Sequence, residues 1–259
     1  MRFLNMAVAS LFMGLAMPSL CNAALVVSYR VTGATRDGAY IRALQRTQIL
    51  ERIVAEFDRV VVPDNQPIGL VLRECGTANA YYVPHERRIF LCSEIVRQIA
   101  QRSRLSAASS APNARARRAS ALSGATLAFL VGHEYGHALI HTRRLPVIAG
   151  EENAADAIAA ALTLNRPKFA AEATLGAILF FDRMPTADRE TAGDVHALDI
   201  QRQINVACWA IGSSVQLRHS FSSLVPAQRA ERCAHEWQQL QLSMRKLLGA
   251  SYRPKVKVF

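Results

Sequence analysis

The sequence predicts a mostly helical α+β domain with a small β-sheet near its N-terminus. Short segments of strand type occur only before residue 93, and longer segments with apolar residues at helical spacing dominate the remainder. We find no internal repeat in the chain. The strands of the sheet should therefore lie within the first 92 residues, and helices should make up most of the remainder.

Residues 1–23 are typical of a secretory signal peptide. Arg2 supplies the positive charge, Phe3–Met17 form the apolar stretch, and small residues ending at Ala23 provide a cleavage site. We therefore expect an exported protein, periplasmic or extracellular, with residues 24–259 as its mature domain. An uncleaved membrane anchor is the alternative. After residue 23 no stretch reaches the ~18 continuous apolar residues that a membrane span needs.

Strand patterns and one helical pattern occupy the region from residue 24 to residue 92. Apolar residues at helical spacing predict a helix over 40–58. Pro84–Arg87 is predicted to connect two strands of a hairpin. The predicted strands cover 24–31, 68–73, 80–83 and 88–92.

A segment rich in Ser, Ala and Arg, residues 103–120, follows a short predicted helix over 93–101. Its biased composition is typical of a mobile segment, so we expect a flexible basic loop there. Beyond the central motif described next, helices are predicted to begin at residue 151 and to cover 168–184, 194–211 and 226–248. Residues 253–259 are expected to form a loose basic tail.

The stretch His133-Glu134-Tyr135-Gly136-His137 follows the pattern H-E-x-x-H. On a helix, residues four apart lie on one face, so His133 and His137 can bind one metal ion. Glu134 is close enough to act on a water that such a metal binds. The pattern can also arise by chance. However, Ala125–Val131 is almost wholly apolar, so the helix should be buried, and buried polar groups without partners are costly.

A third ligand is expected from the helix that begins at residue 151. A catalytic zinc site takes three protein ligands and leaves one position for water. Glu152 is the best third ligand, and Asp156 lies one turn further on, where it could accept a hydrogen bond from a ligand histidine. Glu151 is the weaker alternative as ligand. Both glutamates could instead be ordinary acidic residues at a helix N-terminus.

These residues carry a resemblance to known proteins. HEYGH followed by ENAAD (residues 152–156) resembles the gluzincin class of zinc metallopeptidases, whose pattern is H-E-x-x-H and then E-x-x-x-D. Arg143 stands where a metzincin would have its third histidine, so we reject that class. The flanks are similar to a bacterial family of secreted metallopeptidase-like domains of unknown function. The residues that carry this second similarity are Cys75-Gly76, Asn79–Tyr82, Ile89–Glu94, His196–Arg202, Asn205, Cys208 and Gly212.

The resemblance implies a zincin-like fold and one zinc ion per chain, bound by His133, His137 and Glu152. The predicted function is a secreted or periplasmic zinc metallopeptidase that hydrolyses peptide bonds in a peptide or protein substrate. Glu134 would take a proton from the zinc-activated water and deliver it to the leaving amine. The alternative is a zinc-binding protein on the same fold that binds a partner with little turnover. An intact Glu134 favours the enzyme, because zinc retention alone does not need it.

The resemblance also indicates residues that contact the substrate. An edge strand holds the substrate backbone in metallopeptidases of this shape, and the candidate edge here comprises Asn79, Ala80, Tyr81 and Tyr82. Ordinary hairpin packing is the alternative for this strand. His196 is the candidate donor to the oxyanion that forms during hydrolysis. The alternatives are a histidine tied to Asp199 without a catalytic role, and donation by Tyr81, Tyr82 or Tyr135.

Four cysteines remain after residue 23: Cys75, Cys92, Cys208 and Cys233. An even number in an exported protein suggests disulfides, and three pairings are available. We favour Cys75–Cys92 and Cys208–Cys233, because the members of each pair are close in sequence. A four-cysteine zinc site is the rival, but the chain has no C-x-x-C.

The net charge is +11, or +10 without Arg2 of the signal segment. Such a balance suits nucleic acid, an anionic envelope surface or acidic substrates. The export signal argues against nucleic acid. Contact with an anionic envelope surface therefore stays open, beside the simpler interpretation of a solvated basic surface.

Overall fold

The computed structural model of the protein describes residues 24–33, 35–148, 150–182 and 199–254. The predicted signal segment 1–23, His196 and most of the predicted tail therefore lie outside the described residues. The described chain is mostly helical with one small sheet near its N-terminus, which confirms the predicted fold class. No described helix has the length and apolar composition to cross a membrane.

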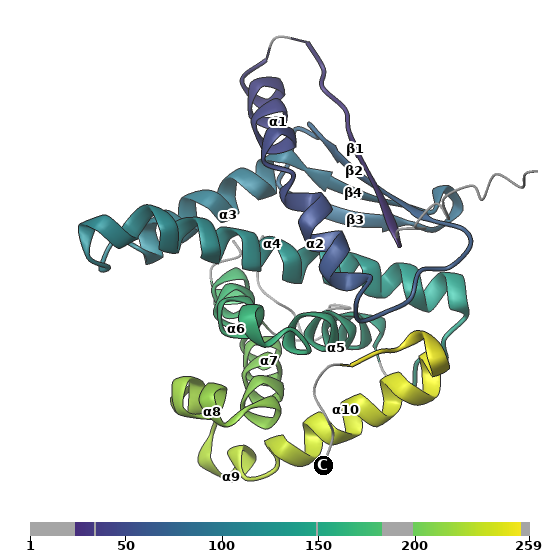
Figure 1. Ribbon diagram of the computed structural model, residues 1–259, viewed down its shortest axis with the longest axis vertical. Coiled ribbons are helices and arrows are strands. Elements are labelled where there is room, and N and C mark those ends of the chain that lie inside the picture. The colour runs from purple at the N-terminus through teal and green to yellow at the C-terminus, as the bar shows by residue number, and fades with distance from the viewer. Residues whose placement is uncertain (1–23, 34, 149, 183–198, 255–259) are drawn as a thin grey trace, which may run out of the picture.

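The sheet has four strands in the order β1-β2-β4-β3 (Figure 1). The strands are β1 (Leu25–Tyr29), β2 (Ile68–Arg73), β3 (Ala80–Val83) and β4 (Arg88–Cys92). β1, β2 and β4 are parallel, whereas β3 pairs with β4 in the antiparallel direction and lies at one edge. The turn between β3 and β4 is a short 3-10 helix, η1 (Pro84–Glu86). All four strands occupy regions in which the sequence predicts strands.

The helix predicted over 40–58 is two helices, α1 (Arg36–Thr47) and α2 (Ile49–Phe57). Gln48 separates them because its backbone is left-handed, with a φ of +50°. The Thr35 hydroxyl caps α1 by accepting a hydrogen bond from the Gly38 N–H (2.9 Å). This break lets α2 turn its apolar face into the core independently of α1, which is largely exposed.

The expected flexible loop over 103–120 is not present. α3 (Ser93–Ser106) continues past residue 103, and after a short turn α4 (Pro112–Arg143) begins. Ala and Arg are strong helix formers, and Pro112 at the first helical position suits a helix start. A composition rich in Ala and Arg is thus as compatible with an exposed helix as with a loop.

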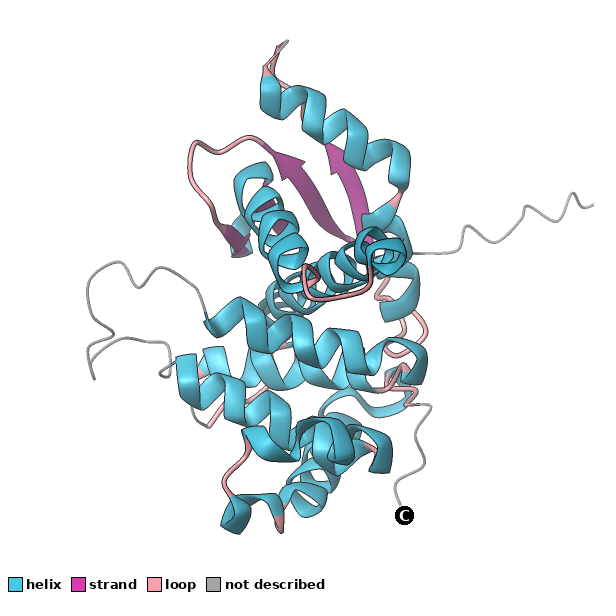
Figure 2. Ribbon diagram, turned by 90° about the vertical axis from the view of Figure 1, so that its left-hand side faces the viewer, coloured by secondary structure: helices cyan, strands magenta, loops and turns pink. Residues whose placement is uncertain are grey.

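Six helices follow: α5 (Glu151–Leu164), α6 (Pro167–Asp182), α7 (Asp199–Ser213), α8 (Val215–Phe221), α9 (Ala227–Ala230) and α10 (Cys233–Leu248). Two 3-10 helices, η2 (Ser222–Leu224) and η3 (Gly249–Ser251), complete the described elements. The helix predicted over 226–248 is interrupted at residues 231–232. Figures 1 and 2 show the sheet at one end of the molecule and α5–α10 at the other, with α4 between them.

The described chain has two main apolar cores. One joins the sheet to α2, α3 and the buried part of α4. The other joins α5–α8 and α10. The chain returns to the first core at its end, where the Arg253 N–H donates to the Val60 carbonyl (2.7 Å). Residue 253 is therefore held against the core and is not part of a loose tail, and residues 255–259 lie outside the described residues.

The structure contains both favoured disulfides. Cys75–Cys92 joins the segment after β2 to the end of β4, and Cys208–Cys233 joins α7 to α10. Bridges that close loops of this length contribute about 3 kcal/mol each. Each bridge thus stabilises one of the two cores.

Candidate metal centre

The buried half of α4 carries the H-E-x-x-H motif, and two glycines bring α5 close to it. A Cβ atom on Gly136 would lie 2.9 Å from the Ala155 Cα, and one on Gly132 would lie 3.3 Å from the Ala159 Cα. The glycines therefore allow the backbones of α4 and α5 to pack more closely than larger residues would. This close approach brings Glu152 and Asp156 to the histidines.

Three side chains converge at the contact between α4 and α5. The Nε2 atoms of His133 and His137 are 3.2 Å apart. The Glu152 carboxylate lies 3.2 Å from the first of these nitrogens and 3.4 Å from the second. Potential ligand atoms of the three residues all lie within 4.8 Å of one another. This group could hold a metal ion.

Both histidines are oriented by carboxylates on their other nitrogen. His133 Nδ1 is 2.8 Å from Asp156 Oδ1, and His137 Nδ1 is 2.8 Å from Glu151 Oε1. An Nδ1–H that donates to a carboxylate leaves the Nε2 lone pair free to bind a metal. Asp156 thus lies where the sequence predicts it. Glu151 does not join the three converging side chains but orients the second histidine.

The carboxylates and the two histidines of the site influence each other's protonation. Burial opposes a charge on His133, but hydrogen bonds to Asp156 and Glu152 outweigh it and raise the pKa of His133 to about 9. Burial would raise the pKa of Glu152, yet its hydrogen bonds to the two histidines hold that pKa below its usual range. Without a metal, the group therefore attracts positive charge in the form of protons.

Glu134 differs from the other acids of the site. It is buried, and burial raises its pKa despite the two neighbouring histidines. A hydrogen bond from the Tyr82 backbone N–H acts in the opposite direction. Glu134 and His133 line a cavity of about 120 Å³ together with Asn79 and Ala80 of the sheet edge. A carboxyl group with a raised pKa beside a cavity is suited to accept and return a proton.

Arg202 of α7 is part of the site, although the sequence pattern predicts no role for it. Its Nε and Nη2 atoms donate to the two carboxylate oxygens of Asp156 (2.7 and 2.9 Å), and its guanidinium lies 4.4 Å from the centre of the Phe181 ring. Arg202 also lines the small cavity. The sequence contains only indirect signs of this role. Arg202 is the last residue of the segment 196–202 that resembles the metallopeptidase-like family, and a buried Asp156 needs a counter-ion.

The tyrosines considered as oxyanion donors lie in different places. Tyr135 is buried and stacks on Phe57 of α2. The Tyr81 hydroxyl accepts a hydrogen bond from Arg73. The Tyr82 hydroxyl contacts His141 Nδ1 (3.0 Å), one helical turn beyond His137. Tyr135 belongs to the motif helix but packs against Phe57, whereas the Tyr82 hydroxyl contacts that helix from the sheet. His196 lies outside the described residues.

The strand that contains Tyr82 has its open side toward α4. The Cys92 N–H donates to the Asn79 carbonyl (3.0 Å), and this register turns the N–H groups of Ala80 and Tyr82 away from β4. Tyr82 donates to Glu134, and the Ala80 N–H donates to the Asn79 side chain (2.9 Å). The edge predicted from the sequence thus borders the cavity beside Glu134.

A second group of potential ligands among the described residues is Cys75, Cys92 and Glu94. The two sulfur atoms are joined in a disulfide, so they cannot act as thiolate ligands. Glu94 instead accepts hydrogen bonds from the N–H groups of Cys75 (3.1 Å) and Gly76 (2.6 Å). This group stabilises the turn after β2.

A family model described as "Putative metallopeptidase" matches residues 29–248. No curated protein and no solved structure matches the chain significantly.

Proposed function

We propose a function from one established premise: the chain belongs to the metallopeptidase family whose model matches residues 29–248. The protein is a zinc-dependent peptidase that hydrolyses peptide bonds at the contact between α4 and α5. The observation that carries this proposal is the convergence of His133, His137 and Glu152, with Glu134 buried beside them.

The chemistry of the donor set supports a cation at this place. Both Nδ1 atoms are engaged by carboxylates, so two Nε2 lone pairs and a carboxylate would face one another. Such an arrangement is repulsive unless protons or a metal lie between the groups. Two nitrogens bound to a tetrahedral zinc at ~2.05 Å would lie ~3.3 Å apart, and the two Nε2 atoms are 3.2 Å apart.

When bound, zinc would polarise the scissile carbonyl and lower the pKa of a water molecule toward ~7. His133, His137 and Glu152 would hold it, and Asp156, Glu151 and Arg202 would keep the imidazoles in the right tautomer and orientation. Glu134 accepts the proton of the attacking water and donates it to the leaving amine. Its raised pKa lets it hold that proton between the two steps.

The substrate backbone is proposed to lie along β3. Asn79 and Ala80 line the cavity that also contains Glu134, so a peptide beside this edge would bring a carbonyl close to the general base. Its backbone would compete with Glu134 and the Asn79 side chain for the outward N–H groups of Tyr82 and Ala80. For the oxyanion, His196 and the Tyr82 hydroxyl are the proposed donors.

We further propose that the protein works outside the cytoplasm. The two disulfides are compatible with an exported protein, and the first 23 residues carry the features of an export signal. Its excess of basic residues would favour contact with an anionic envelope surface.

The test combines metal analysis with a peptide-library cleavage assay. The purified protein should hold about one zinc per chain, and Glu134→Gln should retain zinc and fold while cleavage falls by about 10²–10⁴-fold, the usual effect of losing a general base. Glu172→Gln, a change of the same kind at an exposed residue of α6, is the control and should cleave normally.

Two results would contradict the proposal. Stoichiometric zinc in a His133→Ala/His137→Ala double variant would place the metal elsewhere. Zinc binding without any difference in cleavage between wild type and Glu134→Gln would instead favour a zinc-binding protein that acts through a partner.

A further inference from the structure

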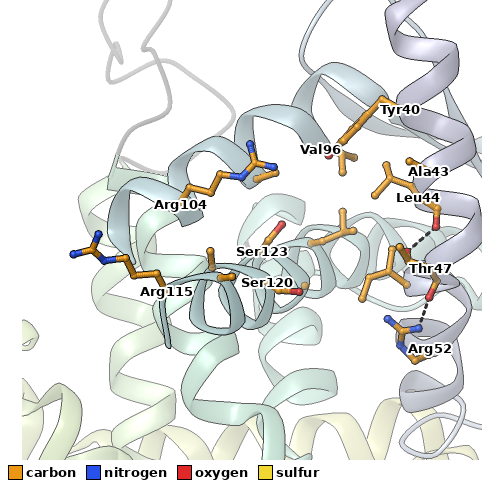
Figure 3. Close-up of a pocket in the computed structure, with 16 residues that line it drawn as sticks. Tyr40, Ala43, Leu44, Thr47, Arg52, Val96, Arg104, Arg115, Ser120 and Ser123 are labelled. Carbon is orange, nitrogen blue, oxygen red and sulfur yellow. Dashed lines mark hydrogen bonds between the residues drawn. The ribbon is translucent and has the colours of Figure 1, made fainter. Parts of the chain in front are cut away.

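A second hollow lies away from the metal centre, between α1, α3 and the exposed half of α4 (Figure 3). Its volume is about 710 Å³, which is within the range of ~300–1,000 Å³ typical of small-molecule sites. None of its lining residues lines the cavity beside Glu134. The two hollows therefore have separate walls.

The wall of this hollow is mainly apolar. Its apolar lining comes from all four helices that surround it: Leu44 of α1, Ile49 of α2, Val96 and Ala100 of α3, and Leu127 of α4. Hydroxyl groups of Thr47, Ser120 and Ser123 are interspersed among them, as Figure 3 shows. Water in such a hollow would be displaced favourably by an apolar chain.

The charged residues of the lining are all basic. They are Arg52, Arg104 and Arg115, and no Asp or Glu among the described residues lines the hollow. Arg52 donates to the Thr47 carbonyl at the end of α1, and the Arg115 Nε donates to the Ser110 carbonyl (2.9 Å). No carboxylate of the described chain forms an ion pair with Arg104 or Arg115.

Arg104 is the best placed of the three to meet a ligand. Figure 3 shows it extending from α3 over the hollow in the direction of Tyr40. Its charge lowers the pKa of the Tyr40 phenol, although burial has the larger and opposite effect and raises that pKa. The guanidinium is exposed and free of acidic partners within the described chain, so an anion could bind it in bidentate geometry.

We propose that this hollow binds a single-chain amphiphile with a carboxylate head, such as a medium-chain or long-chain fatty acid. Arg104 binds the carboxylate, and the apolar tail lies against Leu44, Val96 and Leu127. A purely polar anion would leave the apolar wall in contact with water, and a neutral lipid would leave Arg104 without a counter-charge. This proposal is independent of the peptidase function.

The test is equilibrium dialysis of the purified protein with radiolabelled dodecanoate below its critical micelle concentration. Saturable binding of about one molecule per chain is expected. Arg104→Gln should weaken it by about 10-fold or more, the usual effect of losing a charge-assisted hydrogen bond. Arg218→Gln, an identical charge change at an exposed residue of α8, should leave it unchanged. Ala116→Trp, which fills the hollow from an exposed position on α4, should abolish binding.

Three comparisons can overturn the proposal. Dodecanol binding as tightly as dodecanoate would remove the role of Arg104. Equal effects of Arg104→Gln and Arg218→Gln would show a general charge effect. Binding to phosphatidylglycerol vesicles with no binding of monomeric dodecanoate would assign this face to a membrane surface instead. Circular dichroism of each variant ensures that a loss of binding is not a loss of fold.

Discussion

The N-terminal half of α4, residues 112–124, is largely exposed and carries three arginines, whereas the C-terminal half, residues 125–143, is largely buried and carries the converging histidines. Both halves are one continuous helix, yet different forces stabilise them. The exposed half depends on the helix propensity of Ala and Arg, and the buried half depends on packing between the sheet and α5. A substitution should therefore have very different effects in the two halves.

The glycines of α4 give the largest expected difference. Gly136→Ala would place a Cβ atom 2.9 Å from the backbone of Ala155, so α5 must move away and take Glu152 with it. We expect a loss of stability of ~1–3 kcal/mol and a loss of catalytic efficiency on the order of 10²-fold. Urea unfolding and kcat/KM measure the two effects.

Gly124→Ala is the matched control in the other half. A Cβ atom there would meet only the Ile49 side chain at 3.4 Å, an ordinary contact. Because Ala is the better helix former, this variant should gain up to ~1 kcal/mol of stability. Similar destabilisation by both variants would mean that the two halves are stabilised in the same way.

The orienting carboxylates should differ from each other as well. Asp156→Asn replaces a buried acid that contacts both His133 and Arg202, and it should weaken zinc affinity by about 10–100-fold. Glu151→Gln changes an acid whose side chain is 54% exposed, so its effect on affinity should be smaller. Competition with a fluorescent chelator measures both values. A larger effect for Glu151→Gln would reverse the assigned roles.

A further prediction for the buried half of α4 concerns the pH dependence of zinc binding. The pKa of His133 is about 9 in the metal-free protein, so at neutral pH zinc must displace a proton from it. Zinc affinity should therefore rise by about tenfold per pH unit between pH 7 and pH 9 and then level off as pH passes the pKa. The folding stability of the metal-free protein should change in the opposite direction with pH. The raised pKa of His133 stabilises the fold fully below pH ~6.5, and this contribution is lost as pH rises through about 9.

Calorimetry in buffers of different ionisation enthalpy counts the released protons. Asp156→Asn removes one cause of the raised pKa, so this variant should release less than the wild type near pH 7.5. Zinc binding without proton release in the wild type would contradict the assigned protonation of His133.

The smallest expected effect concerns the exposed half alone. Ala116→Gly should cost ~0.5–1 kcal/mol of stability, because Gly is a poor helix former. Ala108→Gly, in the turn between α3 and α4, should cost less. Equal and negligible effects in urea unfolding would show that the segment around residue 116 behaves as a loop.

Much of this arrangement could be predicted from the sequence, for reasons that depend on distance along the chain. The strands and the pattern around His133 have strong local signals, and Glu152 follows within one helix–loop–helix unit. The exposed half of α4 was missed because it has no apolar face whose period could reveal a helix. Arg202 could not be predicted, because it lies 46 residues after Asp156 in the sequence and their contact depends on how α7 packs.

The short connection between α4 and α5 has a consequence for the order of folding. The three residues proposed to bind the metal and the two carboxylates that contact its histidines, from His133 to Asp156, belong to two consecutive helices joined by residues 144–150. Contacts that are local in sequence form early, because little loop-closure entropy opposes them. A helical hairpin could therefore capture zinc while the chain is still folding, before α7 delivers Arg202 and before β3 lies over Glu134. Metal uptake would then guide the assembly of the remaining site, and refolding in the presence of a chelator would be slower than refolding with zinc.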